Sequence, residues 1–199
     1  MSLTPLPTPP GAISHKTLAK GELLFRQGDQ TTAIFAVRRG RVRMLRHLAD
    51  GAAVPLFVAQ GGDTFSEAAL FSPVYHCDAV ADVETEVEVH PKDALMQALS
   101  ENPDAAQTLM AHLARQVIGL RSRLEIRNIR SAEDRVMQFL QLEGTGGAGD
   151  GAITFPRPLK DIAADIGLTH EAFYRTLAKL EKSGRIVRDG RVIRLVRPG

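Results

Sequence analysis

Apolar residues near the C-terminus recur at spacings of three and four in two neighbouring stretches, residues 159–166 and 170–182. Residues with this spacing lie on one side of a helix, so each stretch predicts an amphipathic helix with one buried face. Gly167 suits the left-handed position that ends a helix, and Thr169 suits the N-terminal cap of the next one. The pattern predicts a helix-turn-helix with the following buried side chains: Ile162, Ala163, Ile166, Phe173, Leu177 and Leu180.

The second predicted helix turns its polar face away from the core, and two short apolar runs follow it within residues 186–195. The Asp189-Gly190 pair between these runs is a strong signal for a β-hairpin. A hairpin that follows a helix-turn-helix makes a winged module. Residues 157–199 hold ten basic and five acidic residues. This surplus of positive charge favours contact with DNA phosphates over an ordinary solvated helix pair.

Residues 18–90 show short β-type runs punctuated by glycine, which is typical of a small all-β roll. Gly40 and Gly51 mark two of the expected turns. Over residues 83–89, valine or threonine alternates with three glutamates, so this strand should have one buried face and one acidic, solvated face. We expect the inward positions of the roll to include Ile34, Phe35, Val37, Val42, Met44, Val54, Leu56 and Val58.

After Pro103, apolar residues spaced alternately by four and three predict one long helix that continues toward Ile129. At 1.5 Å per residue this helix would be roughly 40 Å long, which is more than a small domain needs for itself. We therefore favour pairing with a second copy of the chain over packing against the chain's own roll. The predicted dimer interface comprises Met110, Leu113, Val117, Leu120 and Leu124.

Ser131, with Asp134 three residues later, is the signal for the cap of a new helix and marks a hinge. The chain has 199 residues, which exceeds the usual size of one domain. We expect a β-roll sensor domain over residues 12–101, a dimerisation helix over 102–130 and a winged helix-turn-helix domain over 131–199. The predicted fold class is α+β, with an N-terminal double-stranded β-helix that is jelly-roll-like.

The charge is unevenly distributed along the chain. The formal net charge is +2, but residues 1–111 hold nine basic and thirteen acidic residues, whereas the remainder holds sixteen and ten. This asymmetry predicts different partners for the two ends. Cys77 is the only cysteine, which excludes an intramolecular disulfide and a four-cysteine metal site within one chain. No apolar run approaches the roughly 20 residues that cross a bilayer, and no signal peptide is recognisable, so we expect a cytoplasmic protein without a membrane partner.

Catalytic chemistry is not expected. His47, His76 and His90 are scattered along the chain without an H-x-H pair, and no spacing indicates a Ser/His/Asp or Cys/His arrangement. Residues 144–149, GTGGAG, match a dinucleotide-binding fingerprint by letter, but a predicted helix precedes them where that fingerprint needs a strand. We interpret this run as a surface loop, and we predict neither enzyme activity nor a metal site.

The order of these parts resembles the CRP/FNR family of bacterial transcription regulators over residues 18–196. GELLFRQGDQTTAIFAVRRGRVRML looks like the family's β-roll opening, GDTFSEAALF like its phosphate cassette, and LTHEAFYRTLAKLEKSGRI like its recognition helix. The resemblance implies that Glu171 and Arg175 read base edges, with His170 at a place often held by arginine. Because arginine can donate twice to guanine and glutamate can accept from cytosine N4, we expect a G·C-centred, TGA-like half-site. The expected contacts to the DNA backbone are Thr169, Tyr174, Lys179, Lys182, Arg188 and Arg191.

The resemblance also implies an effector pocket in the cassette, where a glutamate meets ribose hydroxyls and an Arg-Ser pair binds the cyclic phosphate. Glu67 keeps the first role, but Cys77 and Asp78 stand where the Arg-Ser pair should be. A phosphate would therefore meet a carboxylate, so we expect a signal other than cyclic AMP. The expected pocket residues are Gly62, Phe65, Glu67, Ala68, Ala69, Cys77 and Asp78.

We thus predict a homodimeric, sequence-specific DNA-binding transcription regulator. Three alternatives stay open: a cyclic-nucleotide-responsive regulator, a regulator that senses haem or redox state through His76 and Cys77, and a constitutive DNA-binding protein whose roll holds no ligand. The cofactor is unknown, and neither a cyclic nucleotide nor haem is expected. The expected partners are double-stranded DNA with a near-palindromic operator, a second copy of the chain, RNA polymerase and an unknown small-molecule effector.

Overall fold

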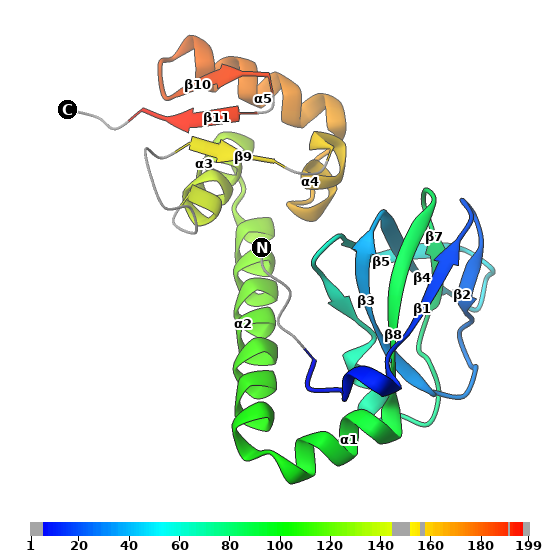
Figure 1. Cartoon of the computed structure of the whole chain (residues 1–199). Coiled ribbons are helices and arrows are strands. Elements are labelled where there is room, and N and C mark those ends of the chain that lie inside the picture. Colours follow the sequence, from blue (N-terminus) through cyan, green and yellow to red (C-terminus); the bar gives the residue numbers. More distant parts are fainter. Residues whose placement is uncertain (1–5, 145–151, 156–157, 191, 197–199) are drawn as a thin grey trace. The chain divides into compact units, whose positions relative to one another are not determined.

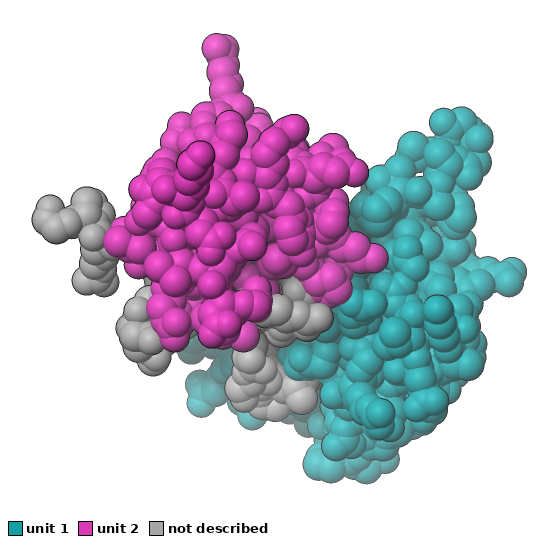
Figure 2. All heavy atoms as spheres, turned by 90° about the horizontal axis from the view of Figure 1, so that it is seen from above, with its two compact units in different colours: residues 1–113 teal, residues 114–199 magenta. Residues whose placement is uncertain are grey.

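The computed structural model describes residues 6–144, 152–155, 158–190 and 192–196. The chain divides into two compact units at the boundary between Leu113 and Ala114, which Figure 2 colours separately. Among the described residues, no helix combines the length and the apolar character that a membrane span requires.

The first unit is built on two four-stranded sheets whose paired strands are all antiparallel (Figure 1). One sheet has the order β1 (Ser14–Leu18), β8 (Thr85–Pro91), β3 (Ala33–Arg39) and β6 (Thr64–Phe65). The other has the order β2 (Leu23–Phe25), β7 (Asp78–Ala81), β4 (Arg41–His47) and β5 (Ala53–Gln60). Neighbouring strands are mostly distant in sequence, and this arrangement confirms the predicted β-roll.

Stacked aromatic rings fill the interior of the roll. The rings of Phe25 and Tyr75 stack with centroids 3.8 Å apart, and Phe35 lies 5.4 Å from Phe25 and 5.3 Å from Phe65. All four side chains are buried, and buried aromatic rings contribute large apolar areas to a core. The buried Tyr75 hydroxyl donates a 2.9 Å hydrogen bond to the Ala33 carbonyl, so its polar end is also satisfied.

The prediction of inward positions is correct for Phe35, Val37 and the two β4 residues. It is wrong for Ile34, which faces the second apolar cluster, and for Val58 and Leu56 of β5. Val58 pairs with Arg43 on the outer face, whereas Ala59 pairs with Val42 and is buried. Leu56 is 48% exposed at a bulge that shifts the register of β5 against β4, and Val54, opposite Arg46, is 39% exposed. The β5 side chains beyond that bulge are not covered by the core of the roll.

The acidic strand also begins later than its sequence pattern suggests. Val83 is 38% exposed and precedes β8, which begins at Thr85. Along β8 the expected alternation holds for Thr85, Glu86 and Val87, and His90 is then buried near the end of the strand. Burial is the main cause that lowers the pKa of His90, and the Glu88 carboxylate opposes it.

Two helices follow the roll: α1 (Lys92–Glu101) and α2 (Pro103–Asn128). The observed bounds of α2 confirm the long helix expected between Pro103 and Ile129. A second apolar cluster anchors these helices and the N-terminal segment to the roll, and its buried members are Leu6, Ile34, Leu70, Leu95 and Leu109. Leu70 comes from a 3-10 turn, η2 (Glu67–Leu70).

The second unit contains the winged helix-turn-helix. Its helices are α3 (Ala132–Gly144), α4 (Leu159–Asp165) and α5 (His170–Lys182). Its three-stranded sheet has the order β10 (Ile186–Asp189), β11 (Val192–Leu195) and β9 (Ala152–Thr154). The predicted hairpin is confirmed, and β9 adds a third strand to it. Gly144 ends α3, and the rest of the predicted glycine-rich loop, residues 145–149, lies outside the described residues.

Two glycines in the first unit allow the effect of backbone strain to be distinguished from that of steric overlap. Both Gly40 and Gly51 have positive φ angles, +94° and +83°. A Cβ atom at Gly51 would meet nothing within 4 Å, whereas one at Gly40 would lie 2.5 Å from the Glu84 carbonyl oxygen and 2.7 Å from the Thr85 Cα. We expect Gly51→Ala to lower the free energy of unfolding by about 1–2 kcal/mol through strain alone.

For Gly40→Ala we expect a further loss of about 1–3 kcal/mol, because the overlap is with backbone atoms that cannot move independently. Urea unfolding followed by circular dichroism gives both values. Equal losses in the two variants would show that the strands around Gly40 adjust freely.

Candidate DNA-binding surface and effector region

The turn between α4 and α5 is held by its own backbone and by one side chain. Gly167 has a φ of +68°, and the Leu168 N–H donates a 2.9 Å hydrogen bond to the Ala163 carbonyl. The Thr169 hydroxyl then accepts a 3.1 Å hydrogen bond from the Ala172 N–H. Both features are the ones that the sequence predicts, and together they fix the direction in which α5 leaves the turn.

Burial of one face of α5 decides which side chains face outward. Phe173, Leu177 and Leu180 are each 0% exposed. The opposite face exposes the predicted base-reading residues and the aromatic ring beside them: His170, Glu171, Tyr174 and Arg175. The Tyr174 ring packs against the His170 ring with centroids 4.5 Å apart. The start of this face is therefore an aromatic pair followed by a guanidinium.

The basic residues around α5 differ in their surroundings. Lys182 is exposed, whereas Lys179 Nζ lies 3.5 Å from a Glu133 carboxylate oxygen and Arg188 Nε lies 3.4 Å from Glu181. These are half-exposed ion pairs, which typically contribute less than about 1 kcal/mol to stability. Their cations can therefore exchange the carboxylate for a phosphate at little cost. Arg191 lies outside the described residues.

A polar hollow of about 300 Å³ lies beside α5 within the second unit. Its lining combines the start of α3 with the middle of α5: Ser131, Ala132, Glu133, Ala172, Arg175, Thr176 and Lys179. The Ser131 hydroxyl accepts a 3.3 Å hydrogen bond from the Asp134 N–H, which confirms the predicted cap. The hollow therefore places the start of α3 next to the predicted base-reading arginine.

Arg135 was not singled out from the sequence, yet it ties the helix-turn-helix to the end of α2. Its guanidinium donates to the carbonyl oxygens of Ile129 at 2.6 and 3.0 Å, Ile166 at 3.3 Å and Gly167 at 3.0 Å. These carbonyls belong to two helix ends that lack further helical partners. Only the tertiary arrangement brings them together, so no local pattern in the sequence signals this role.

The residues of the predicted effector pocket do not share one environment. Phe65, Ala69 and Cys77 pack in or against the core of the roll. Ala68 is exposed, and Gly62 forms the turn before β6 with a φ of +98°. Asp78 and Glu67 are each engaged in hydrogen bonds.

Asp78 turns away from the core. Its carboxylate accepts a 2.8 Å hydrogen bond from the Gln27 N–H and lies 2.9 Å from His47 Nε2. Cys77 faces inward instead, and burial raises the pKa of its thiol above the usual value. The thiol is therefore protonated near neutral pH, which weakens it as a nucleophile and as a metal ligand. Among the described residues, no three His, Cys, Asp or Glu side chains are grouped so that they could hold a metal ion.

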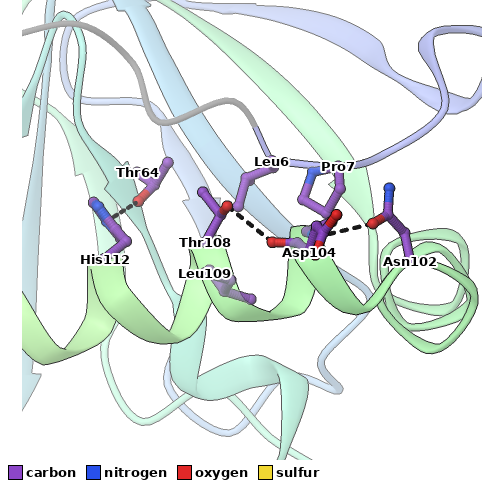
Figure 3. A pocket seen from close by; sticks show the side chains of 9 residues that line it. Leu6, Pro7, Thr64, Asn102, Asp104, Thr108, Leu109 and His112 are labelled. Atoms are coloured by element: carbon purple, nitrogen blue, oxygen red, sulfur yellow. Dashed lines mark hydrogen bonds between the residues drawn. The ribbon is translucent and has the colours of Figure 1, made fainter.

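Glu67 is linked to α2 through a buried threonine. The Thr64 hydroxyl donates a 2.5 Å hydrogen bond to the Glu67 carboxylate and lies 3.3 Å from His112 Nε2. Because the Thr64 hydroxyl has one proton, His112 must be the donor in the second contact. Figure 3 shows His112 and Thr64 beside a cavity of about 360 Å³, which Leu6 and Leu109 also line. His112 was not predicted, because a lone histidine within a helix carries no signal of its own.

The comparisons with known proteins agree with this architecture. Residues 15–102 match the family model of the cyclic nucleotide-binding domain, and residues 134–199 match that of the Crp-like helix-turn-helix domain. The chain belongs to the CRP/FNR family. It is therefore related to bacterial transcription regulators with a helix-turn-helix DNA-binding domain, as the sequence predicted.

Curated relatives of this CRP/FNR-family protein match most of its length. The nitrogen fixation regulation protein FixK of Bradyrhizobium diazoefficiens is 28% identical over 84% of this chain and 72% of its own. The CRP-like cAMP-activated global transcriptional regulator of Mycobacterium tuberculosis is 24% identical over 87% and 80%. Among solved structures, FixK2 from Bradyrhizobium japonicum superposes with a TM-score of 0.69 and 24% identity, covering 93% of each chain. This likeness supports the fold.

Proposed function

We propose that this CRP/FNR-family regulator is a homodimer that reads a near-palindromic duplex operator through the exposed face of α5. The observation that carries the proposal is the complete burial of Phe173, Leu177 and Leu180, which leaves Glu171 and Arg175 exposed on the opposite face. A helix with this arrangement fits the major groove of B-DNA.

The chemistry of the exposed face suits direct base reading. The Arg175 guanidinium can donate to both O6 and N7 of guanine, and the Glu171 carboxylate can accept from N4 of cytosine. His170 is held against Tyr174 and would reach a neighbouring base. Around this face, the proposed contacts to phosphates position the helix without reading sequence: Thr169, Tyr174, Lys179, Lys182, Arg188 and Arg191.

An exposed apolar stripe on α2 supports the homodimer. Met110, Leu120 and Leu124 are 62%, 57% and 60% exposed, and Val117 is 45% exposed. These four residues continue the heptad spacing of the sequence, and burying each against a second copy would contribute roughly 1.5–3 kcal/mol. Leu113 differs, because it is half-buried and packs against the second cluster of the first unit. Two copies would place their α5 helices about 34 Å apart, one turn of DNA.

The first unit would then act as the sensor, through a signal other than cyclic AMP. Such a signal can regulate DNA binding only if it binds two arrangements of the dimer unequally. A cyclic-nucleotide-responsive regulator is the second candidate, and the match to the cyclic nucleotide-binding domain favours it. Burial raises the pKa of the Cys77 thiol, which disfavours a thiolate ligand or a redox-active thiol at this position.

Arg175→Ala tests base reading. We expect it to weaken binding to the selected operator and to relax preference at one base position in each half-site, by about 1–3 kcal/mol per position. Fluorescence anisotropy against operators with single-base changes measures this. Lys182→Ala is the matched control, because loss of a phosphate contact weakens binding to all sequences alike and lowers the salt slope by about 1. A uniform loss for Arg175→Ala would reject direct reading by this residue.

Leu120→Arg tests the dimer. The substitution places two like charges opposite each other in the proposed interface, so we expect sedimentation to show a monomer and full-operator affinity to fall to that for a half-site. Ala111→Arg adds the same charge on α2 outside the apolar stripe and should leave the dimer intact. Circular dichroism would establish that both variants are folded. A Leu120→Arg protein that still sediments as a dimer would contradict the proposed interface.

A further inference from the structure

The inner face of the hairpin formed by β4 and β5 carries an arginine. On β4, Met44 lies opposite Ala79 of β7 with both side chains buried, and Leu45 lies opposite Asp78. Successive side chains of a strand point to opposite faces, so the next residue, Arg46, returns to the inner face. Its Nε donates a hydrogen bond to the carbonyl of His76, the residue before Cys77, and Cys77 packs against the core. Arg46 and Cys77 are therefore neighbours on the side of the sheet that faces the interior of the roll.

The Arg46 guanidinium is fixed near this cysteine without a neutralising partner. Its Nε donates a 3.2 Å hydrogen bond to the His76 carbonyl. None of the acidic side chains in the described part of the chain forms an ion pair with Arg46, although Arg43 on the outer face pairs with Asp82. The side chain is exposed. Its two terminal nitrogens can therefore still receive an anion.

Arg46 is the larger of the two charge effects on the Cys77 thiol. Burial raises the pKa of this thiol, Arg46 opposes that rise, and Asp78 adds to it by a smaller amount. The attraction that Arg46 exerts on a negative charge here therefore exceeds the repulsion by Asp78. The reason is geometric, because the Asp78 carboxylate lies on the other face, where it is engaged by Gln27 and His47.

Apolar side chains flank the guanidinium on the same face. Val54 lies opposite Arg46 on β5, and Phe57 lies opposite Met44. They are 39% and 41% exposed, so no part of the described chain covers them fully. An anion with a short apolar body would bury these two side chains while its charged end meets Arg46. A guanidinium matches a carboxylate with two parallel hydrogen bonds.

We propose that Arg46, Val54 and Phe57 form a binding site for a small organic carboxylate, and that this ligand is the effector of the sensor domain. The effector role rests on the proposed regulatory function, whereas the binding site itself does not. The guanidinium that the cassette lacks at Cys77 and Asp78 is supplied by a different strand.

The single cysteine of the chain provides the test. Iodoacetate and iodoacetamide alkylate the same thiolate and have nearly the same shape, but iodoacetate carries a carboxylate. The ratio of their rates with Cys77 therefore measures attraction of a small carboxylate, independently of the pKa of the thiol. In the native full-length chain we expect this ratio to exceed the ratio in the urea-unfolded chain by about five- to tenfold, because a nearby cation attracts the carboxylate of the reagent.

Substitutions assign that attraction to one residue. Arg46→Gln should reduce the native ratio to the unfolded value, and Arg46→Lys should retain part of it. Arg43→Gln is the matched control, because it removes the same charge from the outer face of the same strand. An unchanged ratio in Arg46→Gln, or an equal reduction in Arg43→Gln, would overturn the site.

The class of ligand is tested by protection. Phenylacetate should slow the reaction of Cys77 with iodoacetamide in the native chain and not in Arg46→Gln, whereas neutral phenylacetamide should protect neither. Protection by cyclic AMP in place of phenylacetate would overturn the carboxylate in favour of a nucleotide, and protection by neither would reject the binding site. All these experiments measure the alkylation rate of Cys77 and do not involve DNA. Failure of the chain to bind DNA would therefore refute the proposed function without affecting the evidence for the carboxylate site.

Discussion

Complete burial of the apolar stripe on α5 is the constraint from which the rest of the DNA-binding unit follows. Phe173, Leu177 and Leu180 are fully buried among side chains of α3, α4 and the three-stranded sheet. Burial of each contributes roughly 1.5–3 kcal/mol, so a rotation of α5 that exposed them would cost several kcal/mol and would bury Arg175. The orientation of the face that we propose to read bases is therefore set by the core.

Alternation along the strands imposes a similar constraint on the sensor unit. Because Ala79 and Ala81 face the core, Asp78 faces the other side of β7, and along β4 Arg46 follows Met44 on the inner face. From the sequence alone, the Asp78 carboxylate is expected where an anion would bind, so that the cassette would repel a cyclic phosphate. The cassette lacks the Arg-Ser pair, but the inner face of the sheet carries the positive charge of Arg46 on β4.

The sequence was sufficient where local chemistry decides the structure. Gly167, Thr169 and the Asp189-Gly190 pair specify turns and caps through their own conformational preferences, and the long apolar heptad of α2 specifies its own helix. The sequence was insufficient where the pairing of distant segments decides the structure. The exposure of Leu56 depends on a bulge that shifts β5 against β4, and the partner strand β9 is separated from the hairpin by two helices. The contacts of Arg135 and His112 likewise join segments that are distant in sequence.

The central claim is that two copies of α5 enter successive major grooves. Methylation interference on a selected operator tests this most directly, because methylation of guanine N7 blocks the atom that Arg175 is expected to contact. The account predicts two symmetric clusters of interfering guanines, with centres about 10 base pairs apart. Interference confined to one cluster, or absent from the major groove while the protein stays bound, would contradict it.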